Sequence, residues 1–380
     1  MTNFTYPCKQ CGGKLEFAPG EHSLNCPYCG AANEIQSANW NAVNEATKEL
    51  DFNEYLSRQA GNEPLLEKQA VKCPSCGAQS QLAQNIVSDR CPFCATPLIV
   101  KDAYSHRSIR PKSIGPFQIK ENEARSNFKK WIDGLWFAPN ALKKNYHASN
   151  GLKALYIPFW TYDCKTVTPY IGERGDYYFV TEEYIENGER KTRQVQRISW
   201  RTVSGTVNAV FDDVLVSGSK SIPQELVDAI SPWQLGSLQA YDDTYVSGIT
   251  VEAYQIGLVS GFSEAKTRID SEIENQIKLD IGGDQQTITN MNPSYSSITF
   301  KHILLPIWMS SYKYGDKTFR FLINGQSGKV EGERPYSIWK IGGLVFLIVM
   351  IIFVCVLFFK NASASATSSP AIMPQTLPYQ

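Results

Sequence analysis

The part of the chain from residue 151 to 336 alternates short apolar runs with Gly, Asp and Asn positions that favour turns. Such alternation predicts strands that are separated by tight turns. We expect helices at 224–230 and 263–279. We expect strands at 177–185, 193–207, 245–254 and 297–305, and a hairpin of 308–314 with 317–324 that turns at Gly315-Asp316. The pattern therefore predicts an α+β domain, 151–336, built on a mainly antiparallel sheet.

The run from 341 to 359 contains nineteen residues without a charge. As a helix it would extend about 28 Å, close to the roughly 30 Å hydrocarbon core of a bilayer. Trp339 and Lys340 on one side and Lys360 on the other are residue types that lie at membrane interfaces. A buried core helix is the alternative, but this run would be apolar on every face. We predict one transmembrane helix at 338–360.

The charges that flank this run predict its orientation. Lys329, Arg334 and Lys340 precede the run, whereas only Lys360 follows it, and 361–380 carries no charge. The positive-inside rule then places the protein in the cell (inner) membrane, with the N-terminal domains in the cytoplasm and the short tail on the outer side. One span so near the C-terminus predicts a single-pass, tail-anchored protein with a disordered tail at 361–380.

Eight of the ten cysteines form four Cys-x-x-Cys pairs near the N-terminus. The pairs are Cys8/Cys11, Cys26/Cys29, Cys73/Cys76 and Cys91/Cys94. Fourteen residues separate the first two pairs and fourteen separate the second two, and the whole set repeats at an offset of 65. This repeat indicates an internal duplication. The N-terminal stretch lacks the apolar core of a signal peptide, which argues against a secreted, disulfide-linked protein.

The spacing of these pairs is typical of Cys₄ zinc ribbons. Two cysteines three apart on a tight turn present both thiolates to one ion, and two such turns complete a tetrahedron around Zn²⁺. Gly12, Gly30 and Gly77 follow three of the turns, where a residue without Cβ is the least strained. We predict two zinc ribbons, 5–34 and 71–99, which hold two structural Zn²⁺ ions.

Two other interpretations apply to the same cysteines. Cys26-Pro27-Tyr28-Cys29 matches the active-site tetrapeptide of glutaredoxins and could act as a redox dithiol. However, no βαβ pattern surrounds it, and an equivalent pair lies fifteen residues upstream. A catalytic zinc ion needs an open position for water, and four thiolates leave none. We therefore prefer the structural interpretation.

Charge differs between the segments around the ribbons, although the whole chain has zero net charge. Residues 1–100 carry a net charge of −3, and 35–70 within them is predicted to be a polar helical spacer. Residues 101–153 carry a net charge of +7 and contain most of a predicted basic helical linker, 100–150, with an amphipathic helix at 121–137. We interpret its basic face as solvated, with contact to anionic lipid or to nucleic acid as the alternatives.

Recognisable catalytic motifs are absent from the sequence. The four histidines have no metal-ligand spacing, and neither a Gly-x-x-x-x-Gly-Lys-Ser/Thr loop nor a Gly-x-Ser-x-Gly elbow occurs. Asp212-Asp213 and Asp242-Asp243 are adjacent pairs, whose side chains on a strand point to opposite faces. We interpret Cys164 as packed, and Cys355 as an apolar filler with lipidation as the alternative. The sequence predicts that the protein is not an enzyme, with a hydrolase or transferase as the weakest alternative.

Six further motifs accompany the doubled ribbons. They are WFAP at 136–139, YIPFW at 156–160, GERGD at 172–176, FDD at 211–213, KHILLP at 301–306 and GERPYS at 332–337. With these motifs the chain resembles a family of bacterial TFIIB-type double zinc-ribbon membrane proteins. Its members are uncharacterised or are labelled primosomal protein or helicase, and relatives occur with SPFH-domain or phage-shock membrane-stress proteins. The resemblance implies recruitment to a membrane, whereas a helicase needs motor motifs that this sequence lacks.

Together these features predict a non-enzymatic, membrane-anchored adaptor. Its zinc ribbons would bind a cytoplasmic or membrane-associated protein, of the SPFH-domain or phage-shock type by resemblance, in a membrane-stress response. Its helix would hold that partner at the lipid bilayer. The alternative is a nucleic-acid-binding protein of replication or transcription, against which the zero net charge argues. The sequence leaves the oligomeric state open.

Overall fold

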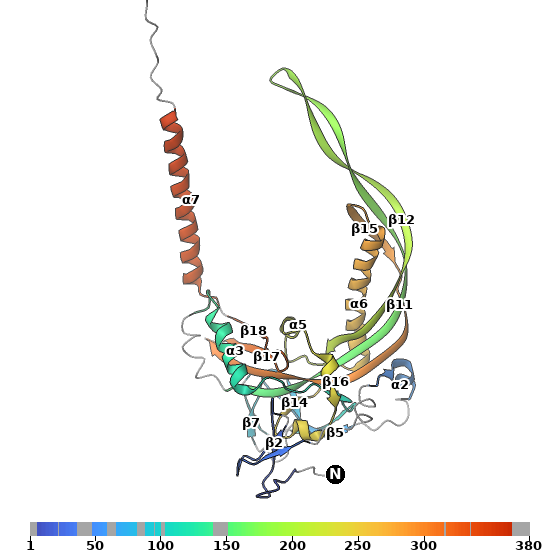
Figure 1. Ribbon diagram of the computed structural model, residues 1–380, viewed down its shortest axis with the longest axis vertical. Coiled ribbons are helices and arrows are strands. Elements are labelled where there is room, and N and C mark those ends of the chain that lie inside the picture. The colour runs from blue at the N-terminus through green and yellow to red at the C-terminus, as the bar shows by residue number, and fades with distance from the viewer. Residues whose placement is uncertain are drawn as a thin grey trace, which may run out of the picture.

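The molecule is an α+β protein with a mainly antiparallel sheet, two Cys₄ units in its N-terminal part and one apolar helix in its C-terminal part. The predicted fold class is confirmed to this extent. Figure 1 shows the sheet as a curved base from which a long hairpin and the C-terminal helix extend in the same direction. The computed structural model describes residues 6–21, 23–35, 48–58, 66–81, 88–94, 96–99, 103–139, 151–314, 317–334 and 336–366.

Two long strands form the centre of the sheet. β11 (Lys153–Glu186) runs antiparallel to β16 (Ser294–Tyr314), with Ile157 opposite Leu305. Both faces of this central pairing are buried, so the strands read as continuous apolar runs rather than as alternating ones. The sheet also contains two parallel pairings, of β10 (Ser113–Ile114) with β16 and of β11 with a short strand near residue 251.

The two faces of this central pairing contact different layers. On one face, Tyr156 and Trp308 pack with helix α3 (Glu121–Asp133) and with the first Cys₄ unit. On the other face, Leu155 and the next two alternate residues along β11 pack with helix α5 (Gln224–Ala229) and with the second Cys₄ unit. Because successive side chains of a strand point to opposite faces, the two Cys₄ units cover opposite faces of one sheet.

The C-terminal edge of the sheet is a hairpin followed by one short strand. β16 pairs with β17 (Lys317–Asn324), and β17 pairs with β18 (Val330–Gly332). The hairpin predicted at 308–314 with 317–324 is therefore confirmed. Its predicted turn, Gly315-Asp316, lies outside the described residues.

The longest feature of the molecule is the hairpin of β11 with β12 (Glu189–Ser217). Glu186 lies opposite Glu189, so that Asn187 and Gly188 form a two-residue turn with φ angles of 55° and 83°. Asn-Gly is the favoured pair for such a turn, because both positions need positive φ. The strands predicted at 177–185 and 193–207 both lie within this hairpin, but the sequence did not indicate that they extend so far.

Helix α6 (Leu258–Ile281) covers the lower part of the hairpin. Its buried isoleucines recur every four residues and therefore form one stripe along the helix, Ile269, Ile273, Ile277 and Ile281. The stripe packs against β11 and β12 beside β15 (Gln285–Met291). The helix predicted at 263–279 is confirmed and is longer at both ends, and α5 matches the helix predicted at 224–230.

The upper part of the hairpin extends beyond the other strands. β15 pairs with β11 only as far as Gly175, and β16 pairs with it only as far as Val167. Beyond Gly175, no other strand in the described part of the chain pairs with β11 or with the facing part of β12. We call residues 174–201 the arm.

The strand predicted at 245–254 is wrong for most of its length. The structure has a short 3₁₀ helix, η4 (Asp243–Val246), and a three-residue strand, β14 (Thr250–Glu252). The carboxylate of Asp242 accepts the backbone N–H of Thr244 at 2.8 Å and caps the 3₁₀ helix. Another 3₁₀ helix and a two-residue strand precede this segment, η3 (Leu235–Ser237) and β13 (Gln239–Ala240).

The predicted helical segments around the ribbons contain strands as well. In the described part of 35–70, only α2 (Phe52–Arg58) is helical, and β4 (Leu50–Asp51) pairs with β16. In the described part of 100–150, β9 (Tyr104–Ser108) and β10 precede helix α3. The helix predicted at 121–137 ends at Asp133, because Gly134 takes the C-terminal cap position. Leu135 is buried beyond the helix, whereas Trp136 is 82% exposed.

Helix α7 (Ile338–Ala366) ends the described chain. Its stretch Ile338–Leu357 is long and apolar enough to cross a membrane, and none of that stretch is buried within the molecule. Within the described residues it is the one helix with this character. The tail predicted at 361–380 is helical up to Ala366, and residues 367–380 lie outside the described residues.

Candidate metal centres

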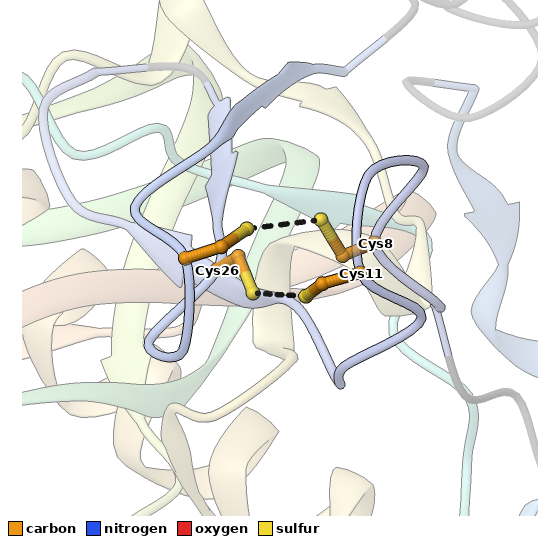
Figure 2. Close-up of side chains that lie close together, drawn as sticks. Cys8, Cys11 and Cys26 are labelled. Carbon is orange, nitrogen blue, oxygen red and sulfur yellow. Dashed lines mark hydrogen bonds between the residues drawn. The ribbon is translucent and has the colours of Figure 1, made fainter.

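The eight cysteines of the N-terminal pairs form two separate clusters of four. Cys8, Cys11, Cys26 and Cys29 form the first cluster, and Cys73, Cys76, Cys91 and Cys94 form the second. Within each cluster all four sulfur atoms lie within 4.8 Å of one another. Figure 2 shows Cys8, Cys11 and Cys26 of the first cluster, whose side chains point toward a common centre. The sequence therefore identified both sets of candidate ligands.

The distances between the sulfur atoms fit a shared metal ion. Cys8 Sγ lies 3.6 Å from Cys29 Sγ, and Cys11 Sγ lies 3.5 Å from Cys26 Sγ. The corresponding distances of the second cluster are 3.5 Å and 3.6 Å. A tetrahedron with Zn–S bonds of about 2.3 Å has edges of about 3.8 Å, whereas a disulfide bond is only about 2.05 Å long. Each cluster is thus arranged to hold one tetrahedrally coordinated metal ion.

The backbone of each turn fixes the direction of the thiolates. Cys8 N–H donates to Gly13 O at 2.7 Å, and Gly12 N–H donates to Cys8 O at 2.8 Å. Gly12 has a φ of 72°, a conformation that favours glycine, and Gly30 and Gly77 adopt the same conformation in their turns. Backbone N–H groups of Cys11 and Gln10 lower the pKa of Cys8 to about 6, which favours the thiolate form that binds metal.

The pairing across the turns also bears on the redox interpretation. Within Cys26-Pro27-Tyr28-Cys29, each sulfur has a near partner in the other turn, with Cys26 Sγ 3.5 Å from Cys11 Sγ and Cys29 Sγ 3.6 Å from Cys8 Sγ. A redox dithiol must instead bring its own two sulfurs together. The tetrapeptide therefore contributes two ligands to a four-sulfur cluster.

Ribbon 1, the unit around the first cluster, has a small sheet of its own. Its strands are β1 (Glu16–Ala18), β2 (Ser23–Asn25) and β3 (Ala32–Glu34). Phe17 anchors the unit, since its ring lies 5.6 Å from Tyr245 and 6.5 Å from Phe117 between centroids. Cys8 and Cys26 are buried on this side, whereas Cys11 and Cys29 are exposed on the other. Ribbon 1 therefore presents one side of its metal centre to solvent.

Ribbon 2, the unit around the second cluster, is continuous with the main sheet. Its strands are β5 (Leu66–Lys72), β6 (Gln79–Gln81), β7 (Ser88–Arg90) and β8 (Pro97–Ile99). β6 pairs with β14 and β5 pairs with β9, which places both in the main sheet. Three of its four cysteines are buried, and Phe93 between two of them is fully buried in the cluster with Leu155 and Ile157.

A third group, made of acidic residues, lies apart from the two cysteine clusters. One carboxylate oxygen each of Glu49, Asp163 and Asp212 lies within 4.8 Å of the others. The buried Lys301 contacts this group, with its Nζ 3.2 Å from Glu49 Oε1 and 2.8 Å from Asp213 Oδ1. The lysine supplies a positive charge that balances the carboxylates. We therefore interpret the acidic group and Lys301 as an ion-pair network.

Two carboxyl groups of this network, Asp163 and Glu49, have pKa values that are shifted in opposite directions. Burial, followed by the hydrogen bond with Glu49, raises the pKa of Asp163 to about 7. The same hydrogen bond lowers the pKa of Glu49 to about 2. The sequence indicated Asp212-Asp213 but missed Glu49 and Asp163, because no local motif joins positions that are far apart in the chain.

The structure also places the other acidic, cysteine and basic residues that the sequence analysis considered. Asp242 caps η4, and Asp243 accepts a hydrogen bond from Lys68 at 3.1 Å. Cys164 is buried against the isoleucine stripe of α6, and Cys355 is exposed on α7. Three described cations of the basic segment contact carboxylates of the same chain, as in the pair of Lys120 with Glu21 at 3.2 Å.

Comparison with known proteins gives one informative relative. The chain is 26% identical over 353 residues to the uncharacterized protein YdjG of Bacillus subtilis (strain 168), which covers 89% of this chain and 92% of that protein. No family model matches the chain. No solved structure matches it either. The similarity covers 89% of this chain, which is far more than the cysteine motifs occupy.

Proposed function

We propose that this protein is a membrane-anchored, zinc-dependent adaptor, and that the exposed turn of ribbon 1 binds a protein partner. The proposal rests on one observation about the duplicated ribbons. Tyr28 and Phe93 occupy equivalent positions in Cys-Pro-aromatic-Cys, at the offset of 65 that relates the two units. Phe93 is fully buried, whereas the side chain of Tyr28 is 77% exposed. The position that attaches ribbon 2 to the sheet is thus free in ribbon 1.

The geometry of Tyr28 suits it to binding a protein. A Cβ atom at Gly13 would lie 2.6 Å from Tyr28 Cδ2, so the ring rests directly on the glycine backbone. A ring that is held in this way loses little conformational entropy when a partner covers it. Tyrosine is also among the residues that carry most binding energy at protein interfaces.

Zinc is the ion that we propose for both clusters. Four thiolates in a tetrahedral arrangement are a ligand set of structural zinc, and they leave no position for a substrate or for water. Zinc in such a site contributes roughly 10–16 kcal/mol to folding. The ions therefore maintain the fold in this proposal, and the protein has no catalytic role.

Helix α7 is the proposed membrane anchor. Its apolar stretch has no cover within the molecule, and the cations that precede it favour a cytoplasmic position for the domains and an external position for the tail. The adaptor would then hold a cytoplasmic or membrane-associated partner at the inner face of the cell membrane. By resemblance, that partner is of the SPFH-domain or phage-shock type and acts in membrane stress.

The partner is tested by affinity purification of the full chain from detergent-solubilised membranes, followed by mass spectrometry. Tyr28→Ser removes the exposed ring without touching a metal ligand, and Trp136→Ser removes an equally exposed aromatic ring elsewhere on the surface. We expect a specific protein that co-purifies with wild type and with Trp136→Ser but is lost with Tyr28→Ser. The same set of proteins from both variants would contradict the assignment of the surface.

The anchor is tested separately by removing residues 338–360 and fractionating the cells. We expect this variant in the soluble fraction, with its two metal ions bound. Removal of residues 367–380 is the matched control, and we expect it to leave the protein in the membrane fraction. A variant without the helix that still sediments with the membranes, after washing with high salt, would contradict the proposed anchor.

A further inference from the structure

The arm is a two-stranded ribbon whose outer edges are free in the described part of the chain. β12 pairs only with β11, and β11 has no second neighbour beyond Gly175. A free edge presents a row of backbone N–H and C=O groups, which is a template for another strand. An isolated two-stranded ribbon is also marginally stable in water at best. A further strand beside such a ribbon would therefore stabilise it.

The charges of the arm are separated by strand. The β11 side carries four acidic residues and one cation, namely Asp176, Glu182, Glu183, Glu186 and Arg174. The β12 side carries five cations and one acid, namely Arg190, Lys191, Arg193, Arg197, Arg201 and Glu189. One edge of the ribbon is therefore acidic and the other is basic. Edges that only prevent association usually carry charge of one sign, because like charges repel a second copy.

The ion pairs within the arm leave N–H donors of two arginines available for further carboxylates. Arg193 and Arg197 both contact the single carboxylate of Glu182. The side chains of both arginines remain more than half exposed. Each guanidinium group has five N–H donors, so a second acidic strand beside β12 could bind them from the other side.

The outer face of the arm, which points away from α6, carries an apolar patch. Tyr177 lies opposite Ile198 in the register, and Gly175 lies opposite Trp200, so these side chains share one face. Phe179, two residues further along β11, is 67% exposed on the same face. The same face also carries polar residues, Thr181, Thr192, Gln194 and Gln196. It is therefore too polar for a lipid-facing strand but suits packing against protein.

We propose that the arm pairs edge to edge with the arm of a second copy of this chain. The acidic β11 edge of one copy then lies beside the basic β12 edge of the next, and the sheet continues from copy to copy as an antiparallel array. Each basic strand then has an acidic strand on both sides. The carboxylates of the second acidic strand contact the exposed parts of Arg193 and Arg197. Because the two contacting edges differ, the contact is head-to-tail and forms a ring where the rotation closes.

The direction of the arm favours this pairing over the symmetric one. In the proposed array all arms point in the same direction, and Figure 1 shows that α7 extends in that direction as well. The α7 helices of neighbouring copies then extend toward the same side of the array. Antiparallel pairing of β12 with β12 of another copy would turn the two arms and the two helices in opposite directions.

The test uses two sets of charge reversals in the full chain, purified in detergent. The first variant, Arg190→Glu with Arg193→Glu and Arg197→Glu, makes both edges acidic. The second, Glu182→Lys with Glu183→Lys and Glu186→Lys, makes both edges basic. We expect wild type to sediment as an oligomer, and each variant alone to dissociate with a dissociation constant raised roughly tenfold or more. An equimolar mixture of the two variants restores the oligomer, because unlike edges meet again.

Controls separate this proposal from a folding defect and from the adaptor function. Glu272→Lys with Glu274→Lys reverses exposed charges on α6 and should leave the oligomer unchanged. Deleting 181–186 and 189–194 shortens the arm, since Val180 and Val195 are paired in the register and are the same type of pair as Glu186 and Glu189, so they can flank the retained Asn187-Gly188 turn. This variant should keep two metal ions and its membrane location but sediment as a monomer.

Three results would overturn the proposal. They are a monomeric wild type at the highest concentration reached, a mixture that does not associate although both variants bind two metal ions, and a shortened arm that still forms the wild-type oligomer. Sedimentation requires neither the partner of ribbon 1 nor a membrane fraction, so these results are distinct from a failure of the proposed adaptor function.

Discussion

Tyr28 and Phe93 occupy the same position in two copies of one metal-binding unit, yet one ring is 77% exposed and the other is fully buried. Ribbon 2 has its aromatic ring, three of its cysteines and two of its strands within the body. Ribbon 1 keeps a sheet of its own and attaches through Phe17, on the side opposite to its exposed turn. The two copies of one motif are therefore packed against the molecule in different ways.

The difference shows what the metal contributes in each unit. Loss of the ion from ribbon 2 disturbs strands that belong to the main sheet, whereas loss from ribbon 1 disturbs a unit at its surface. A typical domain is stable by only about 5–15 kcal/mol, which is comparable to the free energy of zinc binding at one structural site. We therefore expect the fold to depend on ribbon 2 and the binding surface to depend on ribbon 1.

The largest expected effect comes from a ligand of ribbon 2. Cys91→Ser removes a buried thiolate, and we expect the protein to lose most of its native sheet and to be recovered aggregated. Cys29→Ser, which removes an exposed ligand of ribbon 1, should lose or weaken one metal ion but retain the circular dichroism of the folded body. Metal content and circular dichroism of both variants provide the measurement. Equal damage by the two substitutions would remove the distinction between the ribbons.

The next largest effect is expected at Phe93 itself. Phe93→Ala leaves the metal ligands in place but empties a fully buried position, which typically costs about 3–5 kcal/mol. Tyr28→Ala is the matched change in ribbon 1 and should alter the free energy of unfolding by less than about 0.5 kcal/mol. Urea unfolding of both variants with metal bound compares them directly. A destabilised Tyr28→Ala would mean that this ring is packed after all.

A pH dependence is expected at the junction of ribbon 2 with the sheet. His302 lies beside a small space that Gln81 of β6 and Glu252 of β14 also line. Its Nδ1–H donates to Ile109 O at 2.8 Å, and complete burial lowers its pKa from 6.5 to about 4. Between these values the unfolded chain binds a proton at His302 that the native protein does not, so the contribution of His302 to stability falls as the pH falls.

The variant His302→Gln tests this dependence, because glutamine does not titrate. As the pH falls from 6.5 to about 4, wild type should lose up to about 3 kcal/mol more of its free energy of unfolding than the variant does. Both proteins lose metal as the cysteines are protonated, so only the difference between their unfolding curves is informative. Identical slopes for both proteins would show that His302 is not a buried neutral group.

The smallest effect on stability is expected at Gly13, where the consequence is for binding. Gly13→Ala places a Cβ atom 2.6 Å from Tyr28 Cδ2 and 3.3 Å from Cys11 Sγ, so the ring is forced to move and the ligand has to shift only slightly. We expect stability to change by less than about 1 kcal/mol, because the ring is exposed, while retention of the ribbon 1 partner falls. Unfolding curves and partner retention are measured on the same preparation. Unchanged retention would mean that the position of the ring does not matter.

Much of the local structure could be predicted from the sequence, because it follows from spacing. Four Cys-x-x-Cys pairs identified both metal centres, and the helix predicted at 263–279 makes up most of α6. The run at 341–359 identified the apolar helix. Each of these signals depends on residues that are near one another in the chain.

The features that the sequence missed depend on contacts between distant residues. The burial of Phe93 and the exposure of Tyr28 depend on which ribbon meets the sheet, and the two tetrapeptides are nearly identical. The segment 245–254 is apolar enough for a strand, but Gly248 at a φ of 76° and the cap at Asp242 interrupt it. The network of Glu49, Asp163 and Lys301 joins three distant strands or loops, for which no local pattern exists.

Stepwise removal of metal with a chelator, followed by amide hydrogen exchange of the full chain, tests the unequal roles of the ribbons most directly. We predict that the first metal ion leaves from ribbon 1 while β11 and β16 stay protected from exchange. The second ion then leaves from ribbon 2, and protection of the main sheet is lost with it. A sheet that stays protected after both ions have left, or that loses protection with the first, would contradict this account.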